Sequence, residues 1–163
     1  MQSHVRDILG RLRPTRAVEL GLNAAIDDMV AFWRARHGDI VFDVRLLEDE
    51  SLVDEAQKET IYRVVQESLN NAVRHGRPSR IEVAISPGVN GEVITRVSDN
   101  GAAQTDPARP DQSGFGLIGM RERVAASGGS LSIDRGDPGG GWSVIAHLPL
   151  AAPAPSRIRE SVA

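Results

Sequence analysis

The 163-residue chain contains no cysteine and no long apolar run. Without cysteine, neither a disulfide framework nor a thiolate metal site can form, which fits a reducing compartment. No apolar stretch approaches the roughly 20 residues that span a bilayer, and no signal peptide is visible at the start, so we expect a soluble chain. The net charge of −3, with both signs interspersed, excludes the electrostatic surface typical of proteins that bind nucleic acid or anionic membranes.

With 40% hydrophobic residues, the chain is long enough for one domain with a sizeable core, whereas two domains would be cramped. Apolar residues at 3- and 4-residue spacing between Ser3 and Leu12 predict a short amphipathic helix, the end of a longer one, and Pro14 ends it. Beyond Pro149, the alternation of alanine and proline predicts a flexible tail. We therefore divide the chain at 1–14, 15–150 and 151–163.

Periodicity and turn residues predict an ordered series of elements between these ends. A helix over 19–36 should bury Leu20 with six further apolar residues, and His37-Gly38 should end it. A long mobile loop is expected over 102–113, where Pro107 and Pro110 interrupt any pattern. The other predicted elements are a strand over 40–46, a helix over 54–75, a hairpin of strands 81–85 and 92–97, a helix ending at 127, and strands 130–134 and 142–148.

The helix over 54–75 carries both an apolar face and a chemical face. At about 100° per residue, Glu67, Asn71 and Arg74 fall on one narrow stripe, separate from the apolar one. A carboxylate, an amide oxygen and a guanidinium are what Mg-triphosphate requires: a group that orients a nucleophile or water, a ligand for Mg²⁺, and a cation for phosphate oxygens. A solvated helix face would look the same, so the downstream sequence decides.

Two further motifs follow in the chain, Asp99-Asn100-Gly101 at a predicted strand end and Gly114-Phe115-Gly116 before a helix. Each motif alone is typical of a turn or a tight loop. The ordered set resembles the N, G1 and G2 boxes of the ATPase superfamily that contains gyrase, the Hsp90 chaperone, MutL and the histidine kinases. A Rossmann dinucleotide site is rejected because the glycines follow a structureless loop and not a buried strand.

The run from Gly116 to Val124, together with Arg11-Leu12-Arg13-Pro14 and the stretch from Glu67 to His75, is similar to the nitrate-sensor and hexose-phosphate-sensor branch of bacterial histidine kinases. The resemblance implies an α+β fold, a two-layer sandwich of a mixed sheet of about five strands packed on three helices. It makes 1–14 the end of the second dimerisation helix and 15–150 the ATP-binding catalytic domain. It implies phosphotransfer helices of the same kinase and a response regulator as partners. The full-length protein would be a membrane-anchored homodimer with this part in the cytoplasm, monomeric on its own.

The resemblance also implies roles for the site residues. Asp99 would accept a hydrogen bond from the adenine exocyclic amine, and Gly101 would let the backbone approach the base. Asn71 would ligate Mg²⁺, and Glu67 would be the catalytic carboxylate, as a base or as an orienting group. The remaining residues expected to contact ATP are Asn70, Arg74, His75, Gly114, Phe115, Gly116 and Leu117.

Two positions depart from the family pattern: Ala103 replaces a glycine of the first glycine box, and Gly141-Trp142 stands where Gly-Thr is common. The second departure puts a water-mediated contact to adenine in doubt. The phosphoacceptor histidine is absent, and His4 is on the wrong helix, so this chain should bind ATP without phosphorylating itself. A nucleotide-dependent switch module without phosphotransfer and a freestanding ATPase remain as alternatives.

Overall fold

The computed structural model of the chain describes residues 19–101, 114–135 and 140–150. The predicted amino-terminal helix, the loop over 102–113 with Ala103, and the carboxy-terminal tail lie outside these ranges. Within the described ranges, none of the helices combines the length and the apolar character that crossing a membrane requires.

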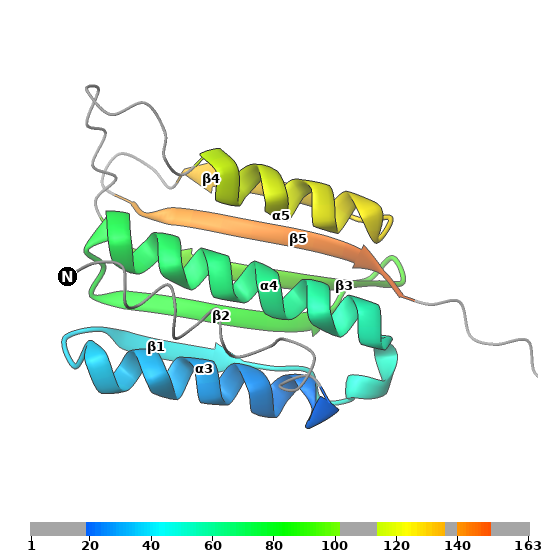
Figure 1. Cartoon of the computed structure of the whole chain (residues 1–163), viewed down its shortest axis with the longest axis horizontal. Coiled ribbons are helices and arrows are strands. Elements are labelled where there is room, and N and C mark those ends of the chain that lie inside the picture. Colours follow the sequence, from blue (N-terminus) through cyan, green and yellow to red (C-terminus); the bar gives the residue numbers. More distant parts are fainter. Residues whose placement is uncertain (1–18, 102–113, 136–139, 151–163) are drawn as a thin grey trace, which may run out of the picture.

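One mixed five-stranded sheet forms the first of two layers (Figure 1). Its strands lie in the order β1-β2-β3-β5-β4. The β1 strand is parallel to β2, and every other neighbouring pair is antiparallel. The strand bounds are β1 Val41–Arg45, β2 Arg80–Pro87, β3 Glu92–Asp99, β4 Ser130–Arg135 and β5 Trp142–Pro149.

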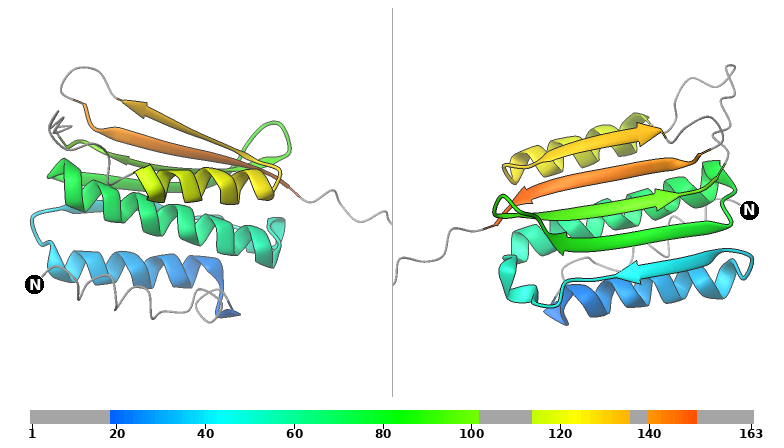
Figure 2. Two further views of the ribbon diagram at one scale, coloured as in Figure 1. Left: turned by 45° about the horizontal axis from the view of Figure 1, so that its top comes forward. Right: turned by 180° about the vertical axis from the view of Figure 1, so that it is seen from behind.

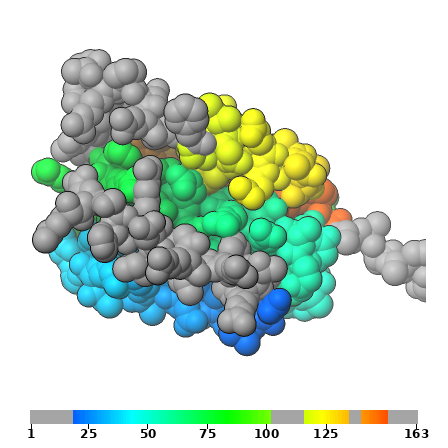
Figure 3. Space-filling view, in the orientation of Figure 1, coloured from blue at the N-terminus to red at the C-terminus, as the bar shows by residue number. Residues whose placement is uncertain are grey.

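Three helices form the second layer, all on the same face of the sheet (Figure 2). They are α3 Leu22–Arg36, α4 Glu55–Asn71 and α5 Gly114–Ala126. The α4 helix lies between the other two, as the space-filling view from the helix side also shows (Figure 3). The predicted fold, a mixed sheet of about five strands on three helices, is confirmed.

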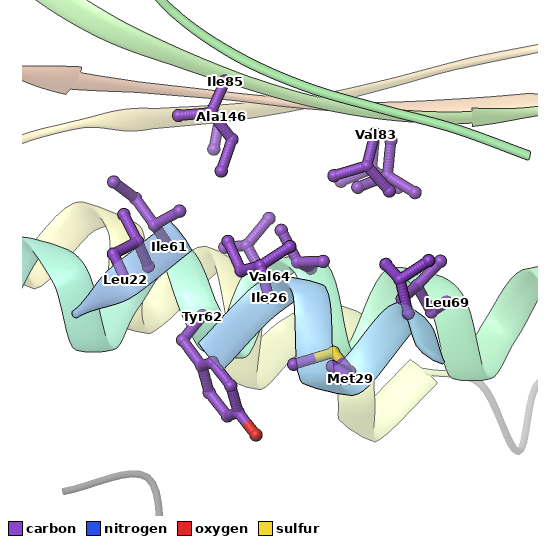
Figure 4. Close-up of a cluster of buried hydrophobic side chains, with 14 of the residues drawn as sticks. Leu22, Ile26, Met29, Ile61, Tyr62, Val64, Leu69, Val83, Ile85 and Ala146 are labelled. Atoms are coloured by element: carbon purple, nitrogen blue, oxygen red, sulfur yellow. The ribbon is translucent and has the colours of Figure 1, made fainter. Parts of the chain in front are cut away.

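The core fills the space between the two layers (Figure 4). In β2 and β3, alternate residues are buried, because successive side chains of a strand point to opposite faces. The α4 helix contributes an apolar stripe at helical spacing that includes Ile61, Val64 and Leu69, each fully buried. This packing fixes α4 against the middle of the sheet, so the residues on its other faces have a defined position.

The start of α4 is fixed by a capping box. The Asp54 carboxylate accepts a hydrogen bond from the Gln57 backbone N–H at 2.8 Å, and the Gln57 side chain accepts one from the Asp54 N–H at 3.0 Å. Two otherwise unpaired N–H groups of the first turn are therefore satisfied. The Gln57 amide also donates to the carbonyl of Pro149, which ties the start of α4 to the end of β5.

The prediction for the start of the preceding helix was wrong. Leu20 is 83% exposed, and α3 begins only at Leu22. Gly21 interrupts the helical backbone with a φ of 108°, and the Glu50 carboxylate accepts a hydrogen bond from the Asn23 N–H in the first turn of α3. A partner 27 residues away therefore sets where this helix begins.

Candidate functional site

Four segments that carry the predicted site residues meet at one end of the sheet, on the left of Figure 1. Because β3 and β5 are antiparallel, with Ser98 opposite Ser143, the end of β3 lies beside the start of β5. The α4 helix packs against β3 and α5, and its carboxyl end continues into a π-helical turn, η2 Ala72–Gly76, that contacts β3. The start of α5 completes the group.

Asp99 is the last residue of β3 and is partly buried. Its Oδ1 accepts a hydrogen bond from the Gly101 N–H at 2.8 Å, an Asx-turn contact. The backbone N–H of Trp142, at the start of β5, also donates to this carboxylate. Burial raises the pKa of Asp99, and the two N–H donors oppose part of that rise. The result is an oriented acceptor whose charge is incompletely compensated by the described residues.

Three glycines lie close to Asp99, and at two of them a Cβ would overlap backbone. A Cβ at position 101 would lie under 3.0 Å from the backbone of Gly76, and one at position 141 would lie under 3.0 Å from the backbone of Asp99. At position 76, a Cβ would lie 3.1 Å from Oδ1 of Asp99. Backbone from η2, the end of β3 and the start of β5 therefore packs closely around this carboxylate.

Glu67 of α4 and Gly116 of α5 are in close contact. A Cβ at position 116 would lie under 3.0 Å from Oε1 of Glu67, so the carboxylate is in contact with the backbone of the first turn of α5. Deeper between the two helices, the Ser68 hydroxyl faces the Met120 sulfur at 4.0 Å. The first-turn N–H groups of α5 therefore begin beside the partly buried carboxylate of α4.

The other predicted residues of the α4 region follow in sequence at its carboxyl end. Asn70 and Asn71 are the last residues of α4 and are partly buried, whereas Arg74 and His75 are exposed on η2. The prediction of a single stripe assumed α-helical turns through position 75, but the helix widens to i→i+5 hydrogen bonds after Asn71. Arg74 is thus rotated away from the position that an α-helix would give it, and π-helical turns of this kind are frequent at functional sites.

The structure places Gly114, Phe115 and Leu117 in the first turn of α5, so this helix begins at Gly114 and not after Gly116 as predicted, and Leu117 packs against the core. Sequence reasoning missed three members of the group: Gly76, Gly141 and the backbone N–H of Trp142. The predicted helix ended at His75, and Gly141-Trp142 stood out only as a departure from the family pattern. All three act through close contacts between segments distant in the sequence, for which the sequence offers no local signal.

A separate hollow of about 260 Å³ lies at the other end of β3. It is lined by the turn before β3, the turn before β4 and the end of β5, and it contains the contact between Glu92 and His147 at 3.1 Å. None of the predicted site residues lines it.

Comparison with known proteins places the chain in a family. Residues 56–152 match the histidine kinase-, DNA gyrase B- and HSP90-like ATPase family. The chain is 37% identical over 129 residues to the signal transduction histidine-protein kinase/phosphatase UhpB of Salmonella typhimurium, covering 79% of this chain and 25% of UhpB. It is 32% identical over 130 residues to the oxygen sensor histidine kinase NreB of Staphylococcus carnosus, covering 80% of this chain and 37% of NreB.

Among solved structures, the mycobacterial sensor histidine kinase MprB matches with a TM-score of 0.57 at 25% identity, covering 77% of this chain and 91% of the MprB chain. The chain spans about a quarter to about a third of the length of the two kinases above. It therefore belongs to the histidine kinase-, DNA gyrase B- and HSP90-like ATPase family.

Proposed function

We propose that this chain binds Mg-ATP at the end of the sheet where Asp99 lies, and that in the whole protein it donates the γ-phosphoryl group to a histidine on a dimerisation helix outside residues 1–163. A response-regulator aspartate would then receive the group. The observation that supports this most is the partly buried Asp99 carboxylate, bordered by backbone at three glycines and oriented by two N–H donors.

Adenine fits the environment of Asp99. An oriented carboxylate accepts a hydrogen bond from the exocyclic amine of adenine, whereas guanine presents a carbonyl oxygen at that position and would leave the acceptor facing another acceptor. Gly101 lets the end of β3 pack directly against the backbone of Gly76, beside the carboxylate that would face the base. The site therefore predicts selection of ATP over GTP.

Phosphates fit the start of α5. Backbone N–H groups in the first turn of a helix bind anions, and Gly114 and Gly116 belong to this turn of α5. Arg74 and His75 on η2 supply exposed groups that can contact phosphate oxygens. Asn70, Phe115 and Leu117 complete the set that we assign to the nucleotide.

Asn71 is the residue that we assign to Mg²⁺. The metal usually keeps several waters and takes few protein ligands, so a single amide oxygen at the end of α4 suits it. When bound, the ion neutralises charge on the phosphate oxygens during transfer. The role of Asn71 is then to hold it at a fixed distance from the carboxylate one helical turn earlier.

Glu67 would orient the attacking histidine. In the transfer, a nitrogen lone pair of that imidazole forms a bond to the γ-phosphorus, the bond from this phosphorus to the β–γ bridging oxygen breaks, and ADP leaves with that oxygen. The phosphorylated ring then loses its N–H proton to a nearby base. The Glu67 carboxylate lies next to the first turn of α5, where it can polarise the ring and accept that proton.

We infer the partners of this chain from the names of its relatives. UhpB and NreB are named as histidine kinases, so we assign this chain phosphotransfer helices of its own protein and a response regulator as partners, and no nucleic acid. We place it in the cytoplasmic part of a membrane-anchored homodimer and expect residues 1–163 alone to be monomeric.

Incubation of the full-length protein with γ-labelled ATP and Mg²⁺ tests the proposal. We expect a protein-bound label that survives base and is lost in acid, as a phosphohistidine is, and Asn71→Ala should abolish it. A wild-type protein that remains unlabelled at every ATP concentration would contradict phosphotransfer. Slow labelling that requires Asn71 would exclude the alternative of a switch module that transfers nothing.

A further inference from the structure

The Asp99 carboxylate is held by donors from two different parts of the chain. The Gly101 N–H belongs to the turn that Asp99 itself begins, at 2.8 Å from Oδ1. The Trp142 N–H belongs to the first residue of β5, which is 43 positions further along the chain, counted as 142 minus 99. A donor in its own turn leaves a carboxylate free to change orientation together with that turn. A second donor from a separate strand fixes it relative to the sheet.

The second hydrogen bond depends on the residue before Trp142. A Cβ at position 141 would lie under 3.0 Å from the carbonyl oxygen and the carbonyl carbon of Asp99 and from its Oδ1. Two of these three atoms are backbone, so no side-chain rotation relieves the overlap. Only glycine at position 141 lets the start of β5 come close enough for the next N–H to reach the carboxylate.

We propose that Gly141 and the backbone N–H of Trp142 are positioning elements for base recognition, which hold the Asp99 carboxylate in the orientation that accepts the adenine amine. This inference rests on the proposed function. According to this inference, the peptide N–H at position 142 orients the Asp99 carboxylate, and the side chain does not. The indole at position 142 therefore leaves base selection intact, since every residue except proline supplies the same N–H.

Two variants of one residue separate the peptide group from the side chain. Trp142→Ala keeps the N–H, whereas Trp142→Pro removes it, at the first residue of a strand where proline is tolerated. Gly141→Ala removes the close approach, and Gly38→Ala is its matched control, because a Cβ at position 38 meets nothing within 4 Å. For each variant of the full-length protein, the dissociation constants of non-hydrolysable ATP and GTP analogues and the melting temperature are measured.

Trp142→Pro and Gly141→Ala should each weaken the ATP analogue by about tenfold or more, with a lower ATP-to-GTP affinity ratio. Trp142→Ala and Gly38→Ala should keep the wild-type ratio. An unchanged ratio in Trp142→Pro, or an equal loss in Trp142→Ala, would overturn the inference. Since Trp142→Pro could unfold, the wild type gives a second measurement: the amide NMR signal of Trp142 should shift with the ionisation of Asp99, and an amide insensitive to it would contradict the hydrogen bond.

The outcome for Asp99→Asn separates this inference from the proposed function. If Asp99→Asn loses ATP selectivity while Trp142→Pro and Gly141→Ala keep it, only the positioning role is wrong. If the wild type binds neither analogue, the proposed nucleotide site is wrong and the positioning role falls with it.

Discussion

The carboxylate of Glu67 and the backbone of Gly116 touch between α4 and α5, so closely that a Cβ at position 116 would lie under 3.0 Å from Oε1. The atom in the way is the far end of a flexible side chain. Position 116 can therefore accept a methyl group if Glu67 moves, which makes it a sensitive test of what the position of that carboxylate does.

Gly116→Ala should lower the phosphotransfer rate by about tenfold or more while the melting temperature changes little, because the displaced carboxylate no longer orients the attacking group. Gly119→Ala on the same helix is the control, since a Cβ there meets nothing within 4 Å. Radiolabel transfer and thermal unfolding measure the two effects. Equal transfer rates in the two variants would show that the Glu67 position is unimportant.

Gly101→Ala should destabilise the fold as well as weaken ATP binding. The new Cβ would overlap the backbone of Gly76, which no rotamer change relieves, so the end of β3 and η2 must separate. We expect a loss of about 1–3 kcal/mol in the free energy of unfolding, typical of overpacking. Urea unfolding of this variant and of Gly38→Ala measures the loss. Equal unfolding midpoints for the two variants would contradict the close approach of Gly101 to the backbone of Gly76.

The raised pKa of Asp99 predicts a pH dependence of stability. Between its ordinary pKa of 3.8 and the raised folded-state pKa, the folded chain binds more protons than the unfolded chain, so the free energy of unfolding falls as pH rises through this window. Asp99→Asn cannot ionise and should therefore be at least as stable as the wild type at neutral pH, with the difference shrinking as pH falls below the window. Urea unfolding of both proteins across this pH range measures the difference in the free energy of unfolding. A variant markedly less stable than the wild type at neutral pH would contradict burial as the main cause of the raised pKa.

Asp54→Ala removes the amino-terminal cap of α4 and should cost about 1 kcal/mol of stability. The variant loses the hydrogen bond that the Asp54 carboxylate accepts from the Gln57 N–H, and it keeps the one that the backbone N–H of residue 54 donates to the Gln57 side chain. Glu55→Ala is the control, because its ion pair with Lys58 is largely solvent-exposed on the glutamate side and such pairs contribute little. Thermal unfolding should separate the two variants, and a Glu55→Ala loss as large as that of Asp54→Ala would be inconsistent with the cap.

Most helices and strands were predictable because each carries its own signal, and the family resemblance implied how they are arranged. The β-branched alternation of β2 and β3 and the apolar stripe of α4 identified those elements from local pattern alone. The start of α3 was not predictable in this way. Leu20 continues the apolar period, but Gly21 takes a positive φ and the Glu50 carboxylate binds the first turn from 27 residues away.

In the candidate site too, some residues have a local sequence signal and others depend on contacts between distant segments. The resemblance to the N, G1 and G2 boxes pointed to Asp99, Gly101 and Gly116, since each stands in a short motif that can be read from the sequence. The π-helical turn after Asn71 could not be predicted, since apolar spacing does not distinguish its hydrogen bonds from those of an α-helix. Nor could the contact of Gly141 with Asp99, which depends on how β3 and β5 pair.

Calorimetric titration of the wild type and Asp99→Asn with non-hydrolysable ATP and GTP analogues, in the presence of Mg²⁺, tests the central claim most directly. We predict that the wild type prefers the ATP analogue by about tenfold or more, and that Asp99→Asn remains folded but loses this preference, because its amide can donate to the guanine carbonyl. Equal affinities of the two proteins for the ATP analogue would show that Asp99 does not recognise the base.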